Sequence, residues 1–174
     1  LDEQALRSIF LEDRTANGFL GRPVTREQLE KAVELALLGP TSANNLPARF
    51  VFVTSPEAKE LLRPALSPGN LEKTMAAPAT AIVATDPNFH EHFDRTFPDR
   101  AAMFKDIFAK MPDEQRLATA WDNALLQMGY FIIALRSLGL DAGPMAGFDR
   151  AAVDAAFFPE GNFRSQYLIN IGYG

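Results

Sequence analysis

The segment from Ala118 to Leu138 constrains the fold more than any other part of the chain. Apolar side chains cover most of the circumference of a helix over this stretch, and Gly139 follows as a stop signal. A helix without a continuous polar face is stable in water only when other elements surround it. The segment therefore predicts a long central helix that lies in the core or at a dimer interface.

The composition limits the kind of protein that can surround such a helix. The chain has 174 residues, 47% of them hydrophobic, which is enough apolar material for the core of one domain spanning residues 1–174. The net charge of −5 and the pI near 5.1 disfavour nucleic acids and anionic membranes as partners. No apolar run has the length of a membrane span, and the N-terminus starts with an amphipathic pattern, so we expect a cytoplasmic protein.

The residue types that are missing or rare narrow the chemistry. Without cysteine the chain has no disulfide, thiolate nucleophile or thiolate metal ligand, so redox chemistry requires a bound cofactor. The two histidines, His90 and His92, lie in a polar region without further metal ligands, and we expect no metal site. A hydrolase elbow, a Rossmann fingerprint and a phosphate loop are also missing from the sequence. A nicotinamide donor would therefore bind only transiently.

Local patterns predict an alternation of helices and short strands. Thr25 and Gln28 form a capping box that opens a helix ending near Gly39. Another helix begins after Ser55 and stops before Pro64. The β-branched, apolar runs that predict strands are 50–53, 80–84 and 167–171, and the first is expected to be buried on both faces.

The region 86–116 departs from this alternation. Charged residues are mixed there with aromatic side chains, namely Phe89, Phe93, Phe97, Phe104 and Phe108. A disordered linker is rarely so aromatic, because it has no core in which to bury such side chains. We interpret the region as a partly helical flap.

Four polar clusters lie between these elements, and each has a structural and a functional interpretation. The stretch 40–45 is held by Pro40 and Pro47 and offers a rigid shelf of hydroxyl and amide groups for a phosphate-bearing heteroaromatic ligand. A well-capped connecting loop explains the same residues. Arg14 and Lys73 suit an anionic ligand, or they are solvated surface cations.

The remaining clusters are equally ambiguous when each is taken alone. Asn70 follows an evident turn, where its amide caps the next helix or contacts a ligand. Pro144 and Met145 suit stacking on a flat ring, and Gly147 permits close approach of the backbone. A turn before a helix accounts for these residues as well.

In order and spacing, the four clusters resemble the FMN-dependent nitroreductase family over nearly the whole chain, from about Ser8 to Gly174. The resemblance implies an α+β nitroreductase-like fold, with a small central mixed β-sheet wrapped by helices in an intertwined homodimer. It also implies two FMN sites at the dimer interface, each completed by a shelf from the neighbouring subunit. The residues implied in FMN binding are Arg14, Thr15, Asn17, Pro40, Thr41, Ser42, Asn44, Asn70, Lys73, Pro144, Met145, Ala146 and Gly147.

The resemblance also assigns roles within that set. Arg14, Thr15 and Asn17 correspond to the segment that binds phosphate and ribityl groups, and Asn70 corresponds to a contact with the flavin ring. Lys73 lies near the pyrimidine edge in the family pattern, where positive charge stabilises the reduced ring. The backbone N–H of Ala146 corresponds to the group near flavin N5.

The implied activity is ping-pong hydride transfer from NAD(P)H through FMN to a small acceptor. Three phrases, 39–44, 65–73 and 143–149, are most similar to the malonic-semialdehyde reductase branch of pyrimidine degradation, whose product is 3-hydroxypropionate. Arg49 or Arg95 would then hold the carboxylate of the acceptor. Leu46, Arg49 and Ala146 depart from residues common in the family, and a general nitro or quinone reductase or a flavin-storage module remains an alternative. The family usually continues into a basic segment beyond the position of Gly174.

Overall fold

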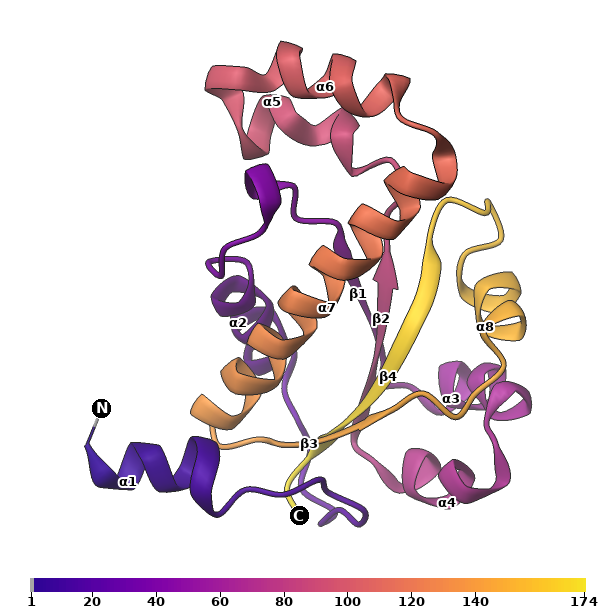
Figure 1. The fold of residues 1–174 in the computed structure, drawn as a ribbon. Coiled ribbons are helices and arrows are strands. Elements are labelled where there is room, and N and C mark those ends of the chain that lie inside the picture. The colour runs from indigo at the N-terminus through magenta and orange to yellow at the C-terminus, as the bar shows by residue number, and fades with distance from the viewer. Residues whose placement is uncertain (1) are drawn as a thin grey trace.

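The computed structural model describes residues 2–174 and contains one four-stranded sheet with helices on both faces (Figure 1). The strands are β1 (Ala48–Val53), β2 (Ala79–Thr85), β3 (Asp141–Met145) and β4 (Arg164–Gly172), in the order β1-β2-β4-β3. Every neighbouring pair is antiparallel, so the predicted mixed sheet is wrong within these residues. The connection from β1 to β2 shows the reason, because Val53 pairs with Thr80 and the chain re-enters the sheet at the end where it left.

Two strands differ from their prediction. Both faces of β1 are covered, since Phe50 and Phe52 pack against one core and Val51 and Val53 against another, but its inner residues are only partly buried because β1 is an edge strand, so the expected burial is confirmed only in part. It is β2, beside it, that is buried throughout. The other edge strand, β3, was not predicted as a strand because Gly143 and Pro144 disfavour this structure, although an edge position tolerates proline.

The long helix lies across one face of the sheet beside α2 (Arg26–Ala36), as Figure 1 shows. This helix, α7 (Asp113–Ser137), begins before the predicted start, and residues 113–116 therefore belong to it and not to the flap. Its Phe131 ring lies 4.6 Å from the ring of Phe50 on β1. Buried residues of α2, α7 and the sheet form the largest core cluster, so the prediction of a core helix is confirmed.

The first two α-helices start with side-chain capping hydrogen bonds, of which the capping box was predicted. Asp2 accepts a hydrogen bond from the N–H of Ala5 at the start of α1 (Glu3–Leu6), which continues into a π-helical turn, η1 (Arg7–Leu11). Thr25 and Gln28 form both bonds of the capping box of α2.

A second core covers the other face of the sheet. The helical elements on this side of the sheet are α3 (Pro56–Leu62), η3 (Arg63–Ala65), α4 (Pro68–Ala76) and α8 (Arg150–Phe157) (Figure 1). As predicted, α3 ends before Pro64.

The aromatic region forms its own small core at one end of the sheet, above α7 in Figure 1. It contains η4 (Phe89–His92), α5 (Phe93–Thr96), η5 (Pro98–Arg100) and α6 (Ala101–Lys110), and we keep the name flap for residues 86–112. The rings of Phe89 and Phe108 lie 4.9 Å apart, edge to face. Among the described residues, no helix is long and apolar enough to cross a membrane.

Candidate functional site

The carbonyl of Gly147 joins two clusters that are far apart in the sequence. It accepts hydrogen bonds from Ser67 N at 3.3 Å, from Ser67 Oγ at 2.5 Å and from Asn70 Nδ2 at 2.9 Å. Asn70 lies within α4, whose N-terminal flanking residue is Ser67, so Asn70 is not the helix cap that its turn allowed. A Cβ on Gly147 would lie only 2.7 Å from Asn70 Nδ2, which explains the need for glycine. The strip 143–147 is thereby clamped to α4.

The N-terminal cluster lies against the same strip. Ala16 N donates to Ala142 O at 3.2 Å, and a Cβ on Gly143 would lie 2.6 Å from Ala16 O. Arg14 Nη1 donates to the carbonyls of Leu11 and Asp13, while its Nε and Nη2 have no hydrogen bond within residues 2–174. Three of the four predicted clusters therefore meet at one end of the sheet, which we call the strip end.

A series of buried side-chain hydrogen bonds connects the strip to the neighbouring strands and to α4. Thr80 Oγ1 donates to Asn170 Oδ1 at 2.9 Å, and Asn170 Nδ2 donates to Thr74 Oγ1 at 3.1 Å. Thr74 Oγ1 lies 3.6 Å from Met145 Sδ. This series joins β2, β4 and α4 to β3, leaving Met145 buried while Ala146 and Gly147 remain exposed.

Lys73 lies on α4, next to this series of buried hydrogen bonds. It is half-buried, immediately precedes Thr74, and has no ion pair or hydrogen bond from its ammonium group within residues 2–174. Thr15 and Asn17 are exposed beside the strip, and Asn17 Nδ2 donates to Thr15 O at 3.3 Å. The strip end thus presents uncommitted cationic groups on both of its flanks.

The shelf lies at the opposite end of the sheet. It precedes Ala48 on the edge strand β1, whereas the strip begins on the other edge strand, β3, where Gly143 is level with Thr80 and Val53, and Met145 with Ile82 and Val51. Three inter-strand spacings separate β1 from β3, which places the two edge strands about 14 Å apart, since neighbouring strands lie about 4.8 Å apart. The shelf therefore does not join the other three clusters in a compact site within one chain.

Shelf residues are held by α7 and the flap. Ser42 N donates to Asn123 Oδ1 at 2.8 Å, and Tyr130 Oη donates to Pro40 O at 2.8 Å. Thr41 Oγ1 accepts from Leu46 N, and Asn44 Nδ2 donates to Thr96 O on the flap. Positive φ angles occur at Ala43, Asn44 and Leu46, a strained conformation for residues other than glycine.

The profile of the nitroreductase family matches residues 14–173. The chain belongs to the nitroreductase family. This membership confirms the predicted family and the prediction that the chain is a flavin-dependent oxidoreductase.

Relatives extend along the whole chain. A Burkholderia lata protein, provisionally named an NADH dehydrogenase/NAD(P)H nitroreductase, is 53% identical over all of this chain, which spans 88% of its length. A Stenotrophomonas maltophilia protein with the same provisional name is 51% identical, and the chain spans 87% of it.

Solved structures confirm the predicted nitroreductase-like fold. One from Bacillus subtilis, also provisionally a nitroreductase, has a TM-score of 0.88 at 22% identity, covering 99% of this chain and 89% of the other. A nitroreductase-like protein of Exiguobacterium sibiricum, solved in complex with FMN, has a TM-score of 0.86 at 16% identity, with coverages of 98% and 87%.

In this member of the family, Arg49 is already engaged by its own chain. Its guanidinium donates to Leu46 O, Ala48 O and Asp86 Oδ2, the last at 2.6 Å. Burial lowers the pKa of Arg49, and the nearby Asp86 partly offsets this effect. Arg95 is exposed on α5 and has no hydrogen bond or ion pair within residues 2–174. Of the two arginines expected to bind an acceptor, only Arg95 is uncommitted.

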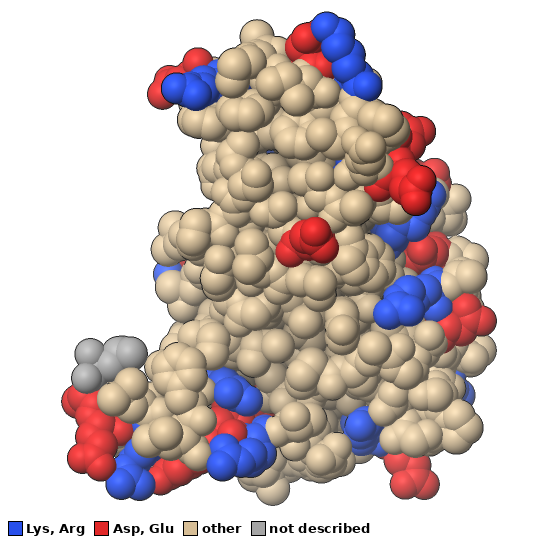
Figure 2. All heavy atoms as spheres, in the orientation of Figure 1, with Lys and Arg blue, Asp and Glu red and all other residues tan. Residues whose placement is uncertain are grey.

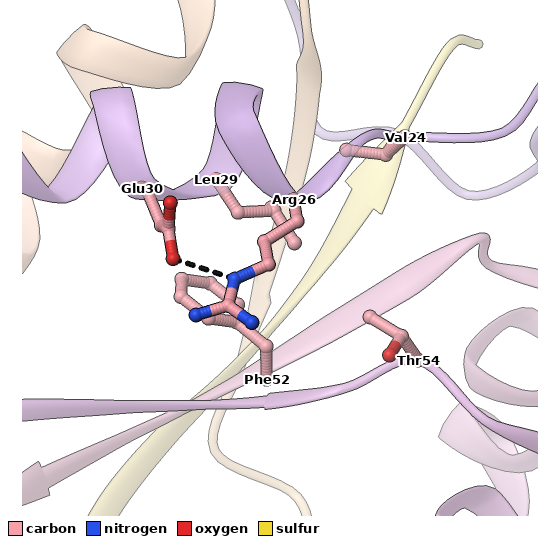
Figure 3. A pocket seen from close by; sticks show the side chains of 6 residues that line it. All are labelled: Val24, Arg26, Leu29, Glu30, Phe52 and Thr54. Atoms are coloured by element: carbon pink, nitrogen blue, oxygen red, sulfur yellow. Dashed lines mark hydrogen bonds and ion pairs between the residues drawn. The ribbon is translucent and has the colours of Figure 1, made fainter.

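A hollow of about 350 Å³ lies away from all four clusters, between α2 and β1. Figure 3 shows Arg26 and Glu30 at its rim, joined by a 2.6 Å ion pair, with Leu29 and Phe52 in its wall. The remaining lining residues are Val24 and Thr54. Since polar groups do not converge in it, we place the candidate site at the strip end.

Sequence reasoning missed the residues that hold this site together. Ser67, Thr74 and Asn170 lie within or beside predicted elements and have no motif of their own. Asn170 carried one detectable signal, because a polar amide in the middle of the apolar run 167–171 requires a buried partner.

Proposed function

We propose that this chain binds FMN at the strip end and is an NAD(P)H-dependent reductase of a small electron-poor acceptor. The observation that carries the proposal is the convergence of three clusters on β3 through the contacts of Gly147 and Ala16. The names of the relatives and the FMN complex of the Exiguobacterium protein support it.

The residues at the strip end fit an elongated ligand with an anionic group and a flat ring. Arg14 has a free edge of its guanidinium for a phosphate, with the polar side chains of Thr15 and Asn17 beside it. The exposed backbone at Ala146 and Gly147 offers a side-chain-poor surface on which a ring can rest.

In this proposal the cofactor and the residues around it have different roles. FMN, when bound, supplies the capacity to accept a hydride from NAD(P)H and pass it to the acceptor. Lys73 would place positive charge beside the ring where negative charge accumulates on reduction. Asn70 keeps Oδ1 available to a ligand while its Nδ2 is bound to Gly147, so the clamp and the ring contact are compatible.

We propose further that the site is completed in an intertwined homodimer, in which the shelf of one chain serves the strip end of the other. The face across which α7 runs is largely uncharged in Figure 2, and Leu38 and Leu126 are 81% and 48% exposed. A second copy of the chain would bury these side chains. Sedimentation should give a dimer, and a monomer that binds FMN normally would contradict this arrangement.

For the acceptor, we propose malonic semialdehyde, with Arg95 as the group that binds its carboxylate. The proposal depends on the three phrases 39–44, 65–73 and 143–149 and on the free guanidinium of Arg95. A general nitro or quinone reductase fits the relatives' names equally well, and such an acceptor does not need Arg95. Storage of FMN without turnover is the non-catalytic alternative.

One experiment tests the proposal and separates these alternatives. The purified protein is analysed by mass spectrometry for released flavin, then mixed anaerobically with NADPH or NADH while its visible absorbance is followed. We expect FMN, bleaching by at least one nicotinamide, and recovery of colour on addition of malonic semialdehyde. Recovery only with a nitroarene or quinone supports the general reductase, and absence of bleaching supports storage. Absence of FMN after reconstitution would contradict the proposed site.

A further inference from the structure

A buried ion pair lies directly behind the segment that carries Arg14. Arg136, near the end of α7, places Nε 2.8 Å from Asp13 Oδ2. Its Nη1 donates to the carbonyl of Ile9 at 3.0 Å. The side chains of Asp13 and Arg136 are only 7% and 19% exposed, so the pair is largely shielded from water.

A buried ion pair of this kind adds little to the stability of a fold, because both charges lose their hydration. Burial raises the pKa of Asp13, an effect that Arg136 opposes and the nearby Asp141 reinforces. Asp13 Oδ1 is buried and has no hydrogen-bond partner within residues 2–174. Arg136 Nε is close to Asp13 but is not aligned for a hydrogen bond with it. An apolar pair of similar volume usually stabilises a protein as well or better, so a role in positioning is the more economical explanation.

The neighbouring contacts show what the pair positions. On the far side of the same residue, the carbonyl of Asp13 accepts a hydrogen bond from Arg14 Nη1 at 2.7 Å. Three residues after Asp13, Ala16 is attached to β3 by a hydrogen bond from its N–H to Ala142 O. The stretch containing Arg14 and Thr15 is thus fixed at both ends, by Arg136 on one side and by β3 on the other.

We propose that Asp13 and Arg136 are a positioning pair that holds Arg14 and Thr15 ready for the phosphate group of the cofactor. This inference rests on the proposed function, because it assumes that these residues face FMN. A segment held in its bound conformation loses less conformational entropy on binding, and the benefit is confined to the ligand group that the segment contacts. The pair should therefore affect recognition of the phosphate and not of the isoalloxazine ring.

Riboflavin, which lacks the phosphate, makes this distinction measurable. Apoprotein is titrated with FMN and with riboflavin by flavin fluorescence, and the ratio of the two dissociation constants is compared among variants. In Asp13→Asn we expect FMN to bind about tenfold more weakly while riboflavin binding stays unchanged. Arg136→Lys, which keeps the charge, should retain part of the preference for FMN. Glu34→Gln is the matched control, since it breaks the exposed Lys31–Glu34 pair elsewhere on the surface.

The outcomes separate this inference from the proposed function. If the parent binds FMN and Asp13→Asn weakens both flavins equally, or neither, the pair is merely structural and the inference is wrong. If the parent binds no FMN, the proposed function itself fails. Thermal melting of each variant identifies unfolded protein, and should Asp13→Asn not fold, the flavin ratio of Arg136→Lys decides by the same criterion.

Discussion

The two ends of the sheet differ in whether a buried asparagine side chain is hydrogen-bonded. At the strip end, Asn170 is fully buried and both of its amide atoms are bonded, to Thr80 and to Thr74. At the shelf end, Asn45 is 1% exposed, and neither of its amide atoms has a partner within residues 2–174. Positive φ angles at Ala43, Asn44 and Leu46 surround it.

The difference means that the two ends contribute unequally to the stability of the single chain. A buried amide without partners costs free energy, as does a non-glycine residue at positive φ. At the strip end, the amide of Asn170 is fully bonded and no described residue other than glycine has a positive φ, although Asp13 Oδ1 behind it is buried without a partner. The shelf end has both, so its local conformation is the less favourable of the two.

The largest expected effect contrasts the two asparagines directly. Asn170→Leu should lower the free energy of unfolding by about 2–4 kcal/mol, because two buried hydroxyls lose their partner. Asn45→Leu removes no bond of the described chain and should change it by less than about 1 kcal/mol. Denaturant unfolding at one fixed protein concentration measures both. Equal losses would mean that the amide of Asn45 is hydrogen-bonded in the folded protein.

The next effect separates two cations at the strip end. Arg14→Ala should weaken FMN binding by about 1.5–3 kcal/mol, the value of a charge-assisted hydrogen bond. Lys73→Ala should instead lower the reduction potential of the flavin and slow its reduction, because positive charge beside the reduced ring is lost. Titration and anaerobic potentiometry distinguish the two results. Variants indistinguishable from the parent in both measurements would place the site elsewhere.

A smaller loss is expected where the strip touches the N-terminal segment. In Gly143→Ala the new Cβ would approach Ala16 O to 2.6 Å, and a backbone carbonyl moves less easily than a side-chain end. The free energy of unfolding should fall by about 1–3 kcal/mol, and FMN affinity should fall with it. Gly69→Ala is the control, since its Cβ would meet no heavy atom within 4 Å. If the two variants have the same free energy of unfolding and the same FMN affinity, the segment around Ala16 can move away from the new Cβ without loss.

The smallest effect concerns pH and is confined to the flap. Burial lowers the pKa of His90 below 6.5, and Arg116 contributes in the same direction. The unfolded chain therefore takes up this proton more readily than the folded one, and stability should fall as pH decreases from 6.5 towards the lowered pKa. Melting temperatures between about pH 7.5 and 5.5 should fall more for the parent than for His90→Gln. Identical slopes would show that His90 does not contribute.

Elements governed by neighbouring residues were predictable. The capping box of Thr25 and Gln28 joins residues three positions apart, and the runs that form β2 and β4 are visible as β-branched segments. In contrast, β3 escaped prediction because Gly143 and Pro144 have low strand propensity and only pairing with β4 stabilises them there. The antiparallel arrangement likewise depends on where the chain re-enters the sheet.

The sequence by itself determined the family, the main helices and strands, and the residue types available to bind an anion and a ring. Only the tertiary structure decided which of these residues meet. The bonds from Ser67 and Asn70 to Gly147 span 80 and 77 positions of the chain, beyond the reach of any local pattern. Packing also decided that Arg49 is occupied by Asp86 while Arg95 is free, because two arginines look alike until their neighbours are known.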